Sequence, residues 1–559
     1  MNIYKKPLYE VRKISDLREL LITSKDLYKE KTAFLTKEGG QYMPVTFRQF
    51  YDDCVCLATA FNEMGLSGKH IGVIGENSYR WAVTYLAVAS MGSVIVPMDK
   101  ELPKEETAPL IEIAQLEAIV YSKKCEETVA DAKINNKINM EEDFSALVKK
   151  GRALREKGDK FFEGVKIDPE VMSVLLFTSG TTSNSKAVML SQKNIVTNIM
   201  AMCKMVYVDE NDTLLSVLPM HHTYECTCGF LAPYYRGCTI AFCEGLRHIQ
   251  KNLKECRATI MLCVPLLADT LYKRVMQGIK KKGKEETVKK AIKISNFLLK
   301  FGIDIRRKLF AEIHESIGGK LSRLVCGAAA TDPQTAAGMR ALGIDVIQGY
   351  GLTECAPICA VNRFEHYRDA AAGLPMPGMD VKITDPDDEG VGEIIVKGDN
   401  VMLGYYKNPE ATAEVMKDGY FKTGDLGYID KKGFVYITGR QKNVIVTKNG
   451  KNIFPEELET YLGRSPYISE SMVYGVDNDE GDTDIYVQIV PSYEDIEEMN
   501  GGPMGTEDVQ HLIEEEVKKV NHTLQNFKRI SKVIIRHEEF AKTTTKKIKR
   551  HVELNKENK

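Results

Sequence analysis

The feature that most constrains the fold is the alternation of amphipathic helical segments with short apolar strands before residue 373. In residues 46–66, apolar side chains recur at helical spacing until Gly65, and the strand-like HIGVIGEN of residues 70–77 follows. Similar apolar strands recur at residues 214–220, 238–243, 258–265, 321–329 and 344–351. This alternation predicts an α/β fold with largely parallel sheets and with ligand sites at the carboxyl ends of their strands.

The chain is also expected to hold more than one domain, because 559 residues exceed a single hydrophobic core. From about Gly373 the sequence is rich in Gly and Pro with short alternating strands, which favours a small antiparallel or barrel-like piece over 373–439. Residues 440–559 have the pattern of strand, helix, strands and helix, typical of a small α+β domain. We therefore predict a large N-terminal domain of stacked, largely parallel sheets with helices over 1–439, and a small C-terminal domain over 440–559.

Composition narrows the class of protein. The formal net charge is −2, and this near-neutrality argues against a nucleic-acid binder. The first 17 residues have no apolar segment typical of a secretory signal, and the 13 cysteines form no CxxC pair, so we expect reduced thiols and a cytoplasmic protein. The long apolar run Trp81–Met98 contains Gly92 and Pro97, which favours a buried helix followed by a buried strand over a transmembrane helix.

A basic segment, residues 280–319, differs from its surroundings. It is rich in Lys and Arg, and its apolar residues recur at helical spacing: Val288, Ala291, Ile292, Leu298 and Leu299. Two interpretations stay open at this stage. The segment is either a solvated basic helix or a helix that contacts an anionic membrane surface where a lipid substrate is collected.

The stretch LLFTSGTTSNSKAVML, residues 175–190, places a hydroxyl-rich loop between two strand-like runs. Gly180 frees backbone N–H groups, and Lys186 adds a positive charge at the far end. The hydroxyl residues are Thr178, Ser179, Thr181, Thr182, Ser183 and Ser185. Such a loop can form an anion-binding nest for phosphates, although Ser185 stands where a Walker loop has its second Gly. A plain Ser/Thr-rich turn is the alternative.

A second motif, GYGLTE, follows a predicted strand. Gly349 and Gly351 would let the backbone approach a ligand, and Tyr350 could stack on a flat ring. Thr353 could contact a phosphate, and Glu354 supplies the hard oxygen that Mg²⁺ prefers.

Two further turns carry polar groups. Asp425 in YFKTGDLG could accept both hydroxyls of a ribose, and Arg440 in ITGRQKN is a forked donor for ribose or phosphate oxygens. Each motif alone is compatible with ordinary turn chemistry. All four in this order favour a nucleotide site.

Taken together, these motifs resemble those of the adenylate-forming superfamily. That superfamily contains acyl-CoA synthetases, peptide-synthetase adenylation domains and luciferases. Nearly the whole chain is covered by motifs similar to the core motifs of that superfamily: FTSGTTSNSKAV, LPMHHTYE, GYGLTE, GEIIVKG, FKTGDLG, GRQKNVIVTKNGKNIFPEELE and KTTTKKIKR. The long basic insertion before LVCGAAATDP is most similar to bacterial long-chain fatty acid–CoA ligases.

The resemblance implies a two-step reaction. A carboxylate attacks the α-phosphorus of ATP to give an acyl-adenylate and pyrophosphate, and a thiol, usually that of coenzyme A, then displaces AMP. Because the first step brings two anions together, catalysis must rest on positioning and on positive charge. The implied cofactors are ATP, Mg²⁺ and coenzyme A, and the implied substrate is a fatty acid.

The resemblance also assigns roles to residues, motif by motif. Thr181, Thr182 and Lys186 would hold the β- and γ-phosphates, within a loop that includes Thr178, Ser179 and Gly180. Glu354 and Thr182 would hold Mg²⁺, and Thr353 the α-phosphate. Asp425 would bind the ribose with help from Arg440, and Gly327 and the Gly349–Gly351 segment with Tyr350 would border the adenine.

Lys547 matches the lysine that bridges the carboxylate and the α-phosphate. Lys442 matches the hinge about which the family rotates its mobile C-terminal domain after adenylation, so that the loop around Gly450 lines the path of the thiol. His222 matches a residue at the entrance of the acyl pocket, with a packed histidine as the alternative, and His221 is expected to be packing.

Several alternatives stay open. The acceptor could be an acyl carrier protein instead of coenzyme A, and the acid could be aromatic. A non-catalytic adenylate sensor is disfavoured, because such a protein would be expected to lack Lys547 or Glu354, and both are present. Peripheral contact with the inner membrane face remains an alternative to a purely cytoplasmic location.

Overall fold

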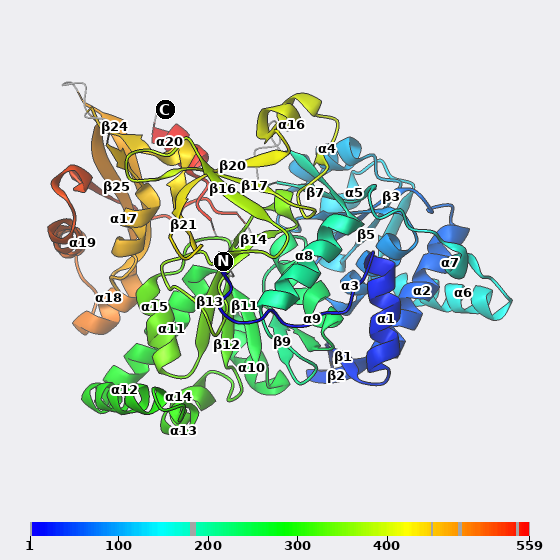
Figure 1. Ribbon diagram of the computed structural model, residues 1–559, viewed down its shortest axis with the longest axis horizontal. Coiled ribbons are helices and arrows are strands. Elements are labelled where there is room, and N and C mark those ends of the chain that lie inside the picture. Colours follow the sequence, from blue (N-terminus) through cyan, green and yellow to red (C-terminus); the bar gives the residue numbers. More distant parts are fainter. Residues whose placement is uncertain (1–2, 179–185, 449–450, 479–482, 544–546, 558–559) are drawn as a thin grey trace. The chain divides into compact units, whose positions relative to one another are not determined.

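The computed structural model describes residues 3–178, 186–448, 451–478, 483–543 and 547–557 (Figure 1). Its contacts divide the chain into two compact units that interleave along the sequence. Unit 1 comprises Met1–Val381, Val396–Phe421 and Lys431–Phe434, and unit 2 comprises Lys382–Ile395, Lys422–Asp430 and Val435–Lys559. The boundary predicted at residue 440 stays a prediction.

One large sheet of unit 1 has nine strands. Their order is β15 (Leu374–Pro375), β14 (Ile358–Val361), β13 (Asp345–Gly351), β12 (Arg323–Cys326), β11 (Ile260–Cys263), β9 (Thr213–Ser216), β10 (Thr239–Phe242), β1 (Thr32–Glu38) and β2 (Gln41–Thr46). Every neighbouring pair from β13 to β1 is parallel. At the edges of the sheet, β2 is antiparallel to β1, β14 to β13, and β15 to β14.

The second large sheet of unit 1 has seven strands. Their order is β18 (Gly404–Tyr405), β8 (Ala187–Ser191), β7 (Met172–Phe177), β4 (Val94–Met98), β3 (His70–Ile74), β5 (Ala118–Tyr121) and β6 (Asn136–Asn139). The strands from β7 to β6 are parallel, whereas β8 and β18 are antiparallel to their neighbours. The two sheets confirm the predicted α/β fold with largely parallel sheets.

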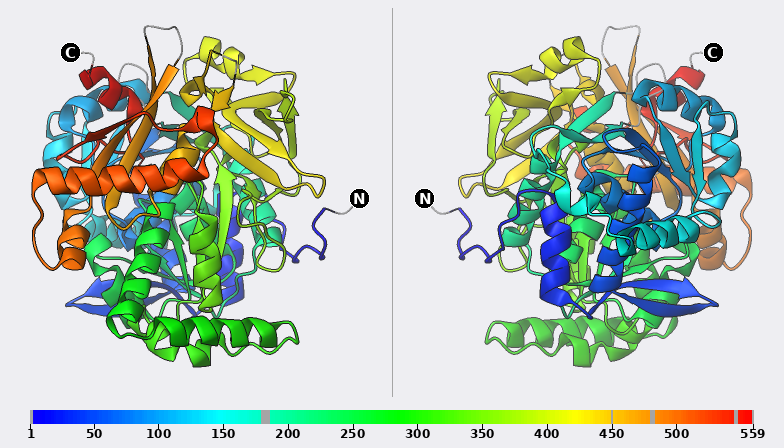
Figure 2. Two further views of the ribbon diagram at one scale, coloured as in Figure 1. Left: turned by 90° about the vertical axis from the view of Figure 1, so that its left-hand side faces the viewer. Right: turned by 90° about the vertical axis from the view of Figure 1, so that its right-hand side faces the viewer.

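Helices cover these sheets (Figures 1 and 2). They are α1 (Leu17–Tyr28), α2 (Phe47–Glu63), α3 (Tyr79–Ser90), α4 (Lys104–Ala114), α5 (Glu126–Ala130), α6 (Phe144–Glu156), α7 (Phe161–Gly164), α8 (Gln192–Met205), α9 (Ala232–Tyr235), α10 (Ile249–Cys256), α11 (Pro265–Lys281), α12 (Glu285–Leu299), α13 (Arg306–Leu309), α14 (Ala311–Ser316), α15 (Pro333–Ala341) and α16 (Pro409–Val415). The helix predicted within residues 46–66 is α2, which begins with a capping box formed by Thr46 and Gln49.

The long apolar run is a buried helix, α3, followed by a buried strand, β4, as predicted. Among the described residues, no helix combines the length and the apolar character needed to cross a membrane. All 13 cysteines are free thiols, and only Cys243 is not fully buried.

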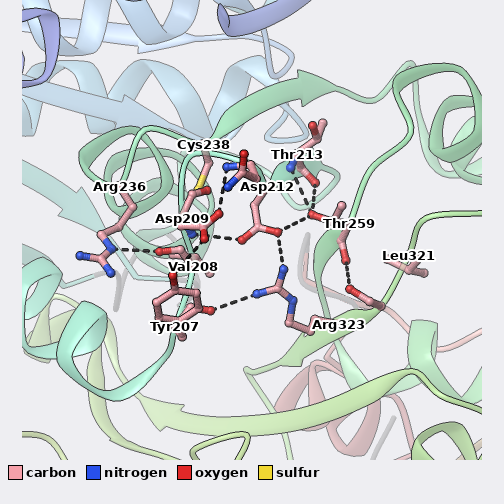
Figure 3. A network of polar contacts seen from close by, with 12 residues as sticks. Tyr207, Val208, Asp209, Asp212, Thr213, Arg236, Cys238, Thr259, Leu321 and Arg323 are labelled. Atoms are coloured by element: carbon pink, nitrogen blue, oxygen red, sulfur yellow. Dashed lines mark hydrogen bonds and ion pairs between the residues drawn. The ribbon is translucent and has the colours of Figure 1, made fainter. Parts of the chain in front are cut away.

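A polar network holds the amino ends of three neighbouring strands, β9, β11 and β12, of the nine-stranded sheet (Figure 3). Asp212 lies at its centre and is 6% exposed. Its carboxylate pairs with the guanidinium of Arg323 and accepts a hydrogen bond from the Thr259 hydroxyl at 2.8 Å and from the Asp209 N–H at 3.1 Å. The amino edge of the sheet is thereby closed by side chains, so sites for ligands are expected at the opposite, carboxyl edge.

The β-rich stretch predicted from residue 373 contains a five-stranded sheet. Four strands follow the order β16 (Asp380–Thr384), β17 (Gly392–Lys397), β20 (Tyr420–Ile429) and β19 (Met416–Lys417), and β21 (Val435–Arg440) also pairs with β20.

The rest of unit 2 is an α+β structure. A three-stranded sheet of β24 (Ile468–Asp477), β25 (Thr483–Pro491) and β26 (Lys532–Ile535) shares a hydrophobic core with its helices. The helices of unit 2 are α17 (Pro455–Leu462), α18 (Tyr493–Asn500), α19 (Thr506–Thr523) and α20 (Arg550–Glu557).

Candidate active site

The predicted phosphate loop joins β7 to β8, which form an antiparallel pair with Phe177 opposite Ala187. The backbone N–H of Thr178 donates to the carbonyl of Lys186 at 3.0 Å, and the Thr178 hydroxyl donates to the same oxygen at 3.2 Å. These bonds tie the backbone of Lys186 to Thr178 at the end of β7. Ser179, Gly180, Thr181 and Thr182 lie outside the described residues, so their predicted contacts with phosphates and Mg²⁺ stay predictions.

Lys186 and Glu354 both contact one side chain, that of Tyr405 on β18. The Lys186 ammonium lies 4.7 Å from the centroid of the Tyr405 ring, within the range of a cation–π contact. The Tyr405 hydroxyl donates to Glu354 Oε1 at 3.0 Å. Burial, and then the Glu354 carboxylate, raise the pKa of Tyr405, so the phenol keeps its proton and acts as the donor. A cation and a carboxylate from distant parts of the sequence are thus held on one ring.

Backbone bonds fix the turn that carries Glu354. Thr353 and Glu354 lie in a short 3₁₀ turn, Thr353–Cys355, directly after β13. The Met402 N–H donates to the Glu354 carbonyl at 2.7 Å. The buried amides of Asn198 and Asn400 donate to the carbonyls of Ile358 at 2.8 Å and Cys355 at 2.7 Å respectively. The phosphate-contacting and metal-binding candidates therefore share one rigid turn.

The glycines of the predicted adenine border have different roles. A side chain at Gly351 would place its Cβ 2.1 Å from the carbonyl oxygen of Pro357, so the fold itself requires glycine there, and the approach of a ligand to this backbone stays a prediction. At Gly327 a Cβ would lie 2.7 Å from the Tyr224 ring, whereas at Gly349 the nearest atom is 3.4 Å away. Tyr350 lies within β13 and is 7% exposed, which leaves little of its ring open for stacking.

In unit 2, Asp425 and Arg440 face each other across β20 and β21. Arg440 Nε lies 2.7 Å from Asp425 Oδ1; the Asp425 side chain is 7% exposed and that of Arg440 is 42% exposed. The Thr423 hydroxyl donates to the Ile394 carbonyl at 2.7 Å and accepts from the Asp425 N–H at 3.1 Å, which fixes the backbone at Asp425. A buried carboxylate beside an accessible guanidinium is suited to sugar hydroxyls and a nearby phosphate.

The same unit presents Lys547 on a small loop. The Thr543 N–H donates to the Lys547 carbonyl at 2.8 Å, and the Lys547 N–H donates to the Thr543 hydroxyl at 3.2 Å. Arg550 anchors the loop, because its guanidinium donates to the Val473 carbonyl at 2.7 Å and pairs with Glu459. Lys546, the adjacent lysine, lies outside the described residues.

The charge of Lys547 is perturbed by its surroundings. Solvent still reaches its side chain, yet loss of solvation, and then the Arg440 guanidinium, lower the pKa of its ammonium, while Asp425 opposes the shift. The structure thus groups Asp425, Arg440 and Lys547 electrostatically within unit 2. An ammonium with a lowered pKa is poised to bind an anion, because a bound anion would restore the favourable environment for its charge.

The two adjacent histidines differ. His221 is buried, its Nε2 lies 3.6 Å from Asp99 Oδ2, and burial lowers its pKa to about 3, so it is neutral and packed, as predicted. The ring of His222 lies 4.1 Å from that of His221 and is partly exposed. The role of His222 at an acyl pocket stays a prediction.

Two buried polar side chains, those of Tyr405 and Glu225, were not expected from the sequence. Tyr405 lies on a two-residue strand, and no local pattern marks it, because its contacts arise only when β18 pairs with β8. Glu225 lies fully buried in a π-helix, Tyr224–Leu231, and accepts from the Ser216 hydroxyl at 2.6 Å. Burial raises the pKa of Glu225 to about 8, so this carboxyl is mostly neutral at physiological pH. The position of Glu225 inside an otherwise apolar segment is the sequence signal that could have indicated a buried carboxyl.

The candidate site residues Glu354 and Lys186 are better suited to a magnesium–nucleotide complex than to a permanently bound metal ion. In the part of the chain that the structure describes, no cluster of three His, Cys, Asp or Glu side chains could hold a metal ion. Glu354 supplies a carboxylate near Lys186, and Mg²⁺ is commonly bound by one or two carboxylates together with substrate phosphates.

The two residues predicted for the domain rotation lie in the second half of the chain. Lys442 lies exposed in a short turn, Gln441–Asn443, and Gly450 lies outside the described residues.

Two models of known protein families match most of the chain. Residues 23–406 match the family described as AMP-binding enzyme, and residues 442–556 match the AMP-binding enzyme C-terminal domain. Human long-chain-fatty-acid–CoA ligase 1 is 29% identical over 487 residues, which cover 78% of this chain and 68% of that protein. Long-chain-fatty-acid–CoA ligase FadD15 of Mycobacterium tuberculosis is 25% identical over 466 residues, covering 78% of this chain and 76% of its own.

Solved structures share the fold at lower identity. The anthranilate CoA ligase AuaEII in complex with anthranoyl-AMP superimposes with a TM-score of 0.77 at 18% identity, and covers 100% of this chain and 99% of its own. ATP-bound MatB from Rhodopseudomonas palustris has a TM-score of 0.74 at 22% identity, covering 97% of this chain and 98% of its own.

Proposed function

This chain belongs to the AMP-binding enzyme family and is an AMP-forming acid–thiol ligase, and we propose that it joins a fatty acid to coenzyme A with ATP as the activating substrate. The observation that carries the proposal is the convergence of Lys186 and Glu354 on Tyr405 at the mouth of the loop between β7 and β8. This arrangement supplies a cation for phosphate oxygens and a carboxylate for the magnesium ion that accompanies ATP.

In the first step, Lys186 and the hydroxyls of the loop bind the β- and γ-phosphates, and Thr353 contacts the α-phosphate. Glu354 would hold a magnesium ion that accompanies ATP, and such an ion would neutralise phosphate charge. The fatty carboxylate oxygen forms a bond to the α-phosphorus while the bond to the bridging oxygen of pyrophosphate breaks. Lys547 stabilises the negative charge on the carboxylate and the α-phosphate, and Asp425 with Arg440 binds the ribose.

In the second step, the thiol of coenzyme A attacks the acyl carbonyl carbon, and AMP leaves. We propose that residues 440–559 turn about Lys442 between the steps, which withdraws Lys547 and lets the loop around Gly450 border the path of the thiol. The exposed position of Lys442 in a short turn supports its use as a hinge. His222 is assigned to the entrance of the acyl pocket.

A long-chain or medium-chain aliphatic acid is the proposed substrate, supported by the two curated relatives, which are named as long-chain-fatty-acid–CoA ligases. Small residues at 327–330, Gly-Ala-Ala-Ala, leave room for a bulky acid. We place the enzyme in the cytoplasm because its described thiols are reduced and mostly buried.

The test is a screen that measures pyrophosphate and AMP release across aliphatic and aromatic acids, with and without coenzyme A. A fatty acyl-CoA ligase should release pyrophosphate with fatty acids and turn over repeatedly only when coenzyme A is present. Turnover with a phosphopantetheinylated acyl carrier protein but not with coenzyme A would reassign the acceptor. Preference for aromatic acids would reassign the substrate, and no release with any acid would overturn the proposal.

A further inference from the structure

The helix α12 of unit 1 has an exposed apolar stripe that its packing does not explain. Ile294 and Phe297 lie on α12, Phe301 lies in the turn that follows it, and each of the three is more than half exposed. The rings of Phe297 and Phe301 contact each other, with centroids 5.2 Å apart. Ile303, just beyond, is also more than half exposed. We call these four residues the apolar stripe.

The opposite side of α12 packs against the hydrophobic core of unit 1. Val288, Ala291 and Ile292 pack against the hydrophobic cluster beneath the helix, and Ser295 is fully buried on the same side. The rotation of the helix is therefore fixed, and the apolar stripe faces away from the cluster. Figure 2 shows α12, in green, along the outer edge of unit 1. Large apolar groups gathered on an open surface indicate an interaction site.

A basic stripe runs beside the apolar one. Lys289 and Lys293 share an adjacent side of α12, Lys300 is the residue at its C-terminal cap, and each of the three is exposed. Lys289 pairs with Glu286 at 2.8 Å, whereas Lys293 and Lys300 form no ion pair among the residues that the structure describes. Residues 280–308 contain eleven Lys and Arg against three Asp and Glu, although the whole chain has a net charge of −2. Positive charge is thus concentrated at the apolar stripe.

We propose that α12 is a docking face for an anionic phospholipid surface, with the apolar stripe inserted between headgroups and the basic stripe on lipid phosphates. A helix with adjacent apolar and cationic sides lies in the plane of such an interface, and the long lysine side chains can reach headgroup phosphates. An acidic protein would pair with the lysines but would need a pocket for two phenyl rings. A second copy of the chain would oppose two strongly positive faces.

The inference extends the proposed function and rests on it in one respect: docking would place a fatty acid ligase beside the bilayer in which its substrate dissolves. The binding itself is independent of catalysis. Two classes of variant separate the contributions. Phe297→Ser with Phe301→Ser removes apolar area, and Lys293→Glu with Lys300→Glu reverses charge, while the packed side of α12 is untouched.

The experiment is flotation of the full chain with vesicles of phosphatidylcholine alone or of equal parts phosphatidylcholine and phosphatidylglycerol. The wild type should float with the anionic vesicles only, and added salt should weaken the association. Each double variant should lower the vesicle-bound fraction roughly tenfold, because both contributions are needed for stable attachment. Matched controls are Val171→Ser with Leu246→Ser, at exposed apolar residues, and Lys149→Glu with Lys150→Glu, on α6; they should bind as the wild type does.

Failure of the wild type to float with anionic vesicles overturns the inference, as does binding by both double variants that equals that of the wild type. A concentration-dependent dimer that the phenylalanine variant abolishes would assign the face to a second copy instead. Fatty acid presented on albumin provides the link to function. If no acyl-CoA forms from albumin-bound or vesicle-dissolved acid, the proposed function fails, and the flotation result still decides the docking face.

Discussion

In unit 1, Lys186 and Glu354 both contact Tyr405, and the segments that carry them are held by main-chain hydrogen bonds to buried strands. In unit 2, Asp425 and Arg440 face each other across two strands and are joined by an ion pair between their side chains. The first group has no ion pair between its own described members and leaves its cation and carboxylate for a ligand. The second group partly neutralises itself, and Lys547 lies in the field of both members.

The two groups should therefore respond differently to substitution. Because β8, β18 and the 353–355 turn are tied by backbone bonds, the unit 1 group is rigid, and removal of one hydroxyl there should leave the frame intact. The unit 2 group is electrostatically coupled, so changing one charge should alter the protonation of another. Four predictions test this comparison.

The largest effect is expected at Lys547. Lys547→Ala should slow acyl-adenylate formation about 10²–10³-fold, since it removes the charge on the developing transition state. Thioester formation from supplied acyl-adenylate should be nearly unchanged. Rapid-quench assays of the two half-reactions measure both. Lys549→Ala, in the same loop, is the matched control and should behave as the wild type does; equal loss in both half-reactions would refute the division of labour between the units.

A smaller effect is expected at Tyr405. Tyr405→Phe keeps the ring beneath Lys186 but removes the donor to Glu354, so the apparent affinity for magnesium–ATP should fall roughly tenfold. Titration of ATP at fixed and at saturating magnesium measures the change. Tyr406→Phe removes an exposed hydroxyl that donates to Gln115 at 3.0 Å and serves as the neighbouring control. An unchanged affinity in Tyr405→Phe would show that Glu354 is held without its tyrosine.

A pH shift should reveal the coupling in unit 2. Adenylation needs a charged Lys547, so its rate should fall as pH rises through the pKa of that lysine. Arg440→Gln removes a charge that lowers this pKa and should move the alkaline limb to higher pH, whereas Asp425→Asn should move it to lower pH. Solvent should moderate the shift in Arg440→Gln, because Arg440 is partly exposed and its charge is screened.

The measurement is the pH–rate profile of pyrophosphate release under single-turnover conditions, and the position of the limb is read separately from the height of the profile. Arg464→Gln, at an exposed residue of the same unit, should leave the limb in place. Shifts of the same sign in both site variants would argue against direct electrostatic coupling to Lys547.

The smallest effect on catalysis is expected from the amino edge of the nine-stranded sheet. Asp212→Asn should lower the stability of unit 1 by about 1.5–3 kcal/mol, because it removes the charged acceptor of Arg323 and Thr259. The KM for ATP should not change, since the candidate residues Thr353 and Glu354 follow the opposite, carboxyl end of β13. Thermal unfolding and steady-state kinetics on the same preparations test this, and a change in KM without a loss of stability would contradict it.

Much of the fold and part of the site could be predicted from the sequence. Helical and strand periodicity is local, so α2, α3 and the parallel strands follow from residue spacing. The composition around Lys186 and Glu354 also marks these two residues, whereas Asp425, which was expected in a turn, lies within β20. Tyr405 could not be found because its role depends on strand pairing between residues more than two hundred positions apart. The reason for Gly351 was also hidden, since only the tertiary fold brings the Pro357 carbonyl against it.

The interleaving of the two units has a practical consequence for dissecting the protein. The chain passes from one unit to the other five times between residues 381 and 435. A cut after residue 440 would leave β20 and β21 on the N-terminal fragment, although β21 and most of β20 belong to unit 2, so neither fragment would hold that unit complete. The same cut would part Asp425 and Arg440 from Lys547. Coexpression of the two fragments is therefore a better route to half-reaction studies than expression of either one by itself.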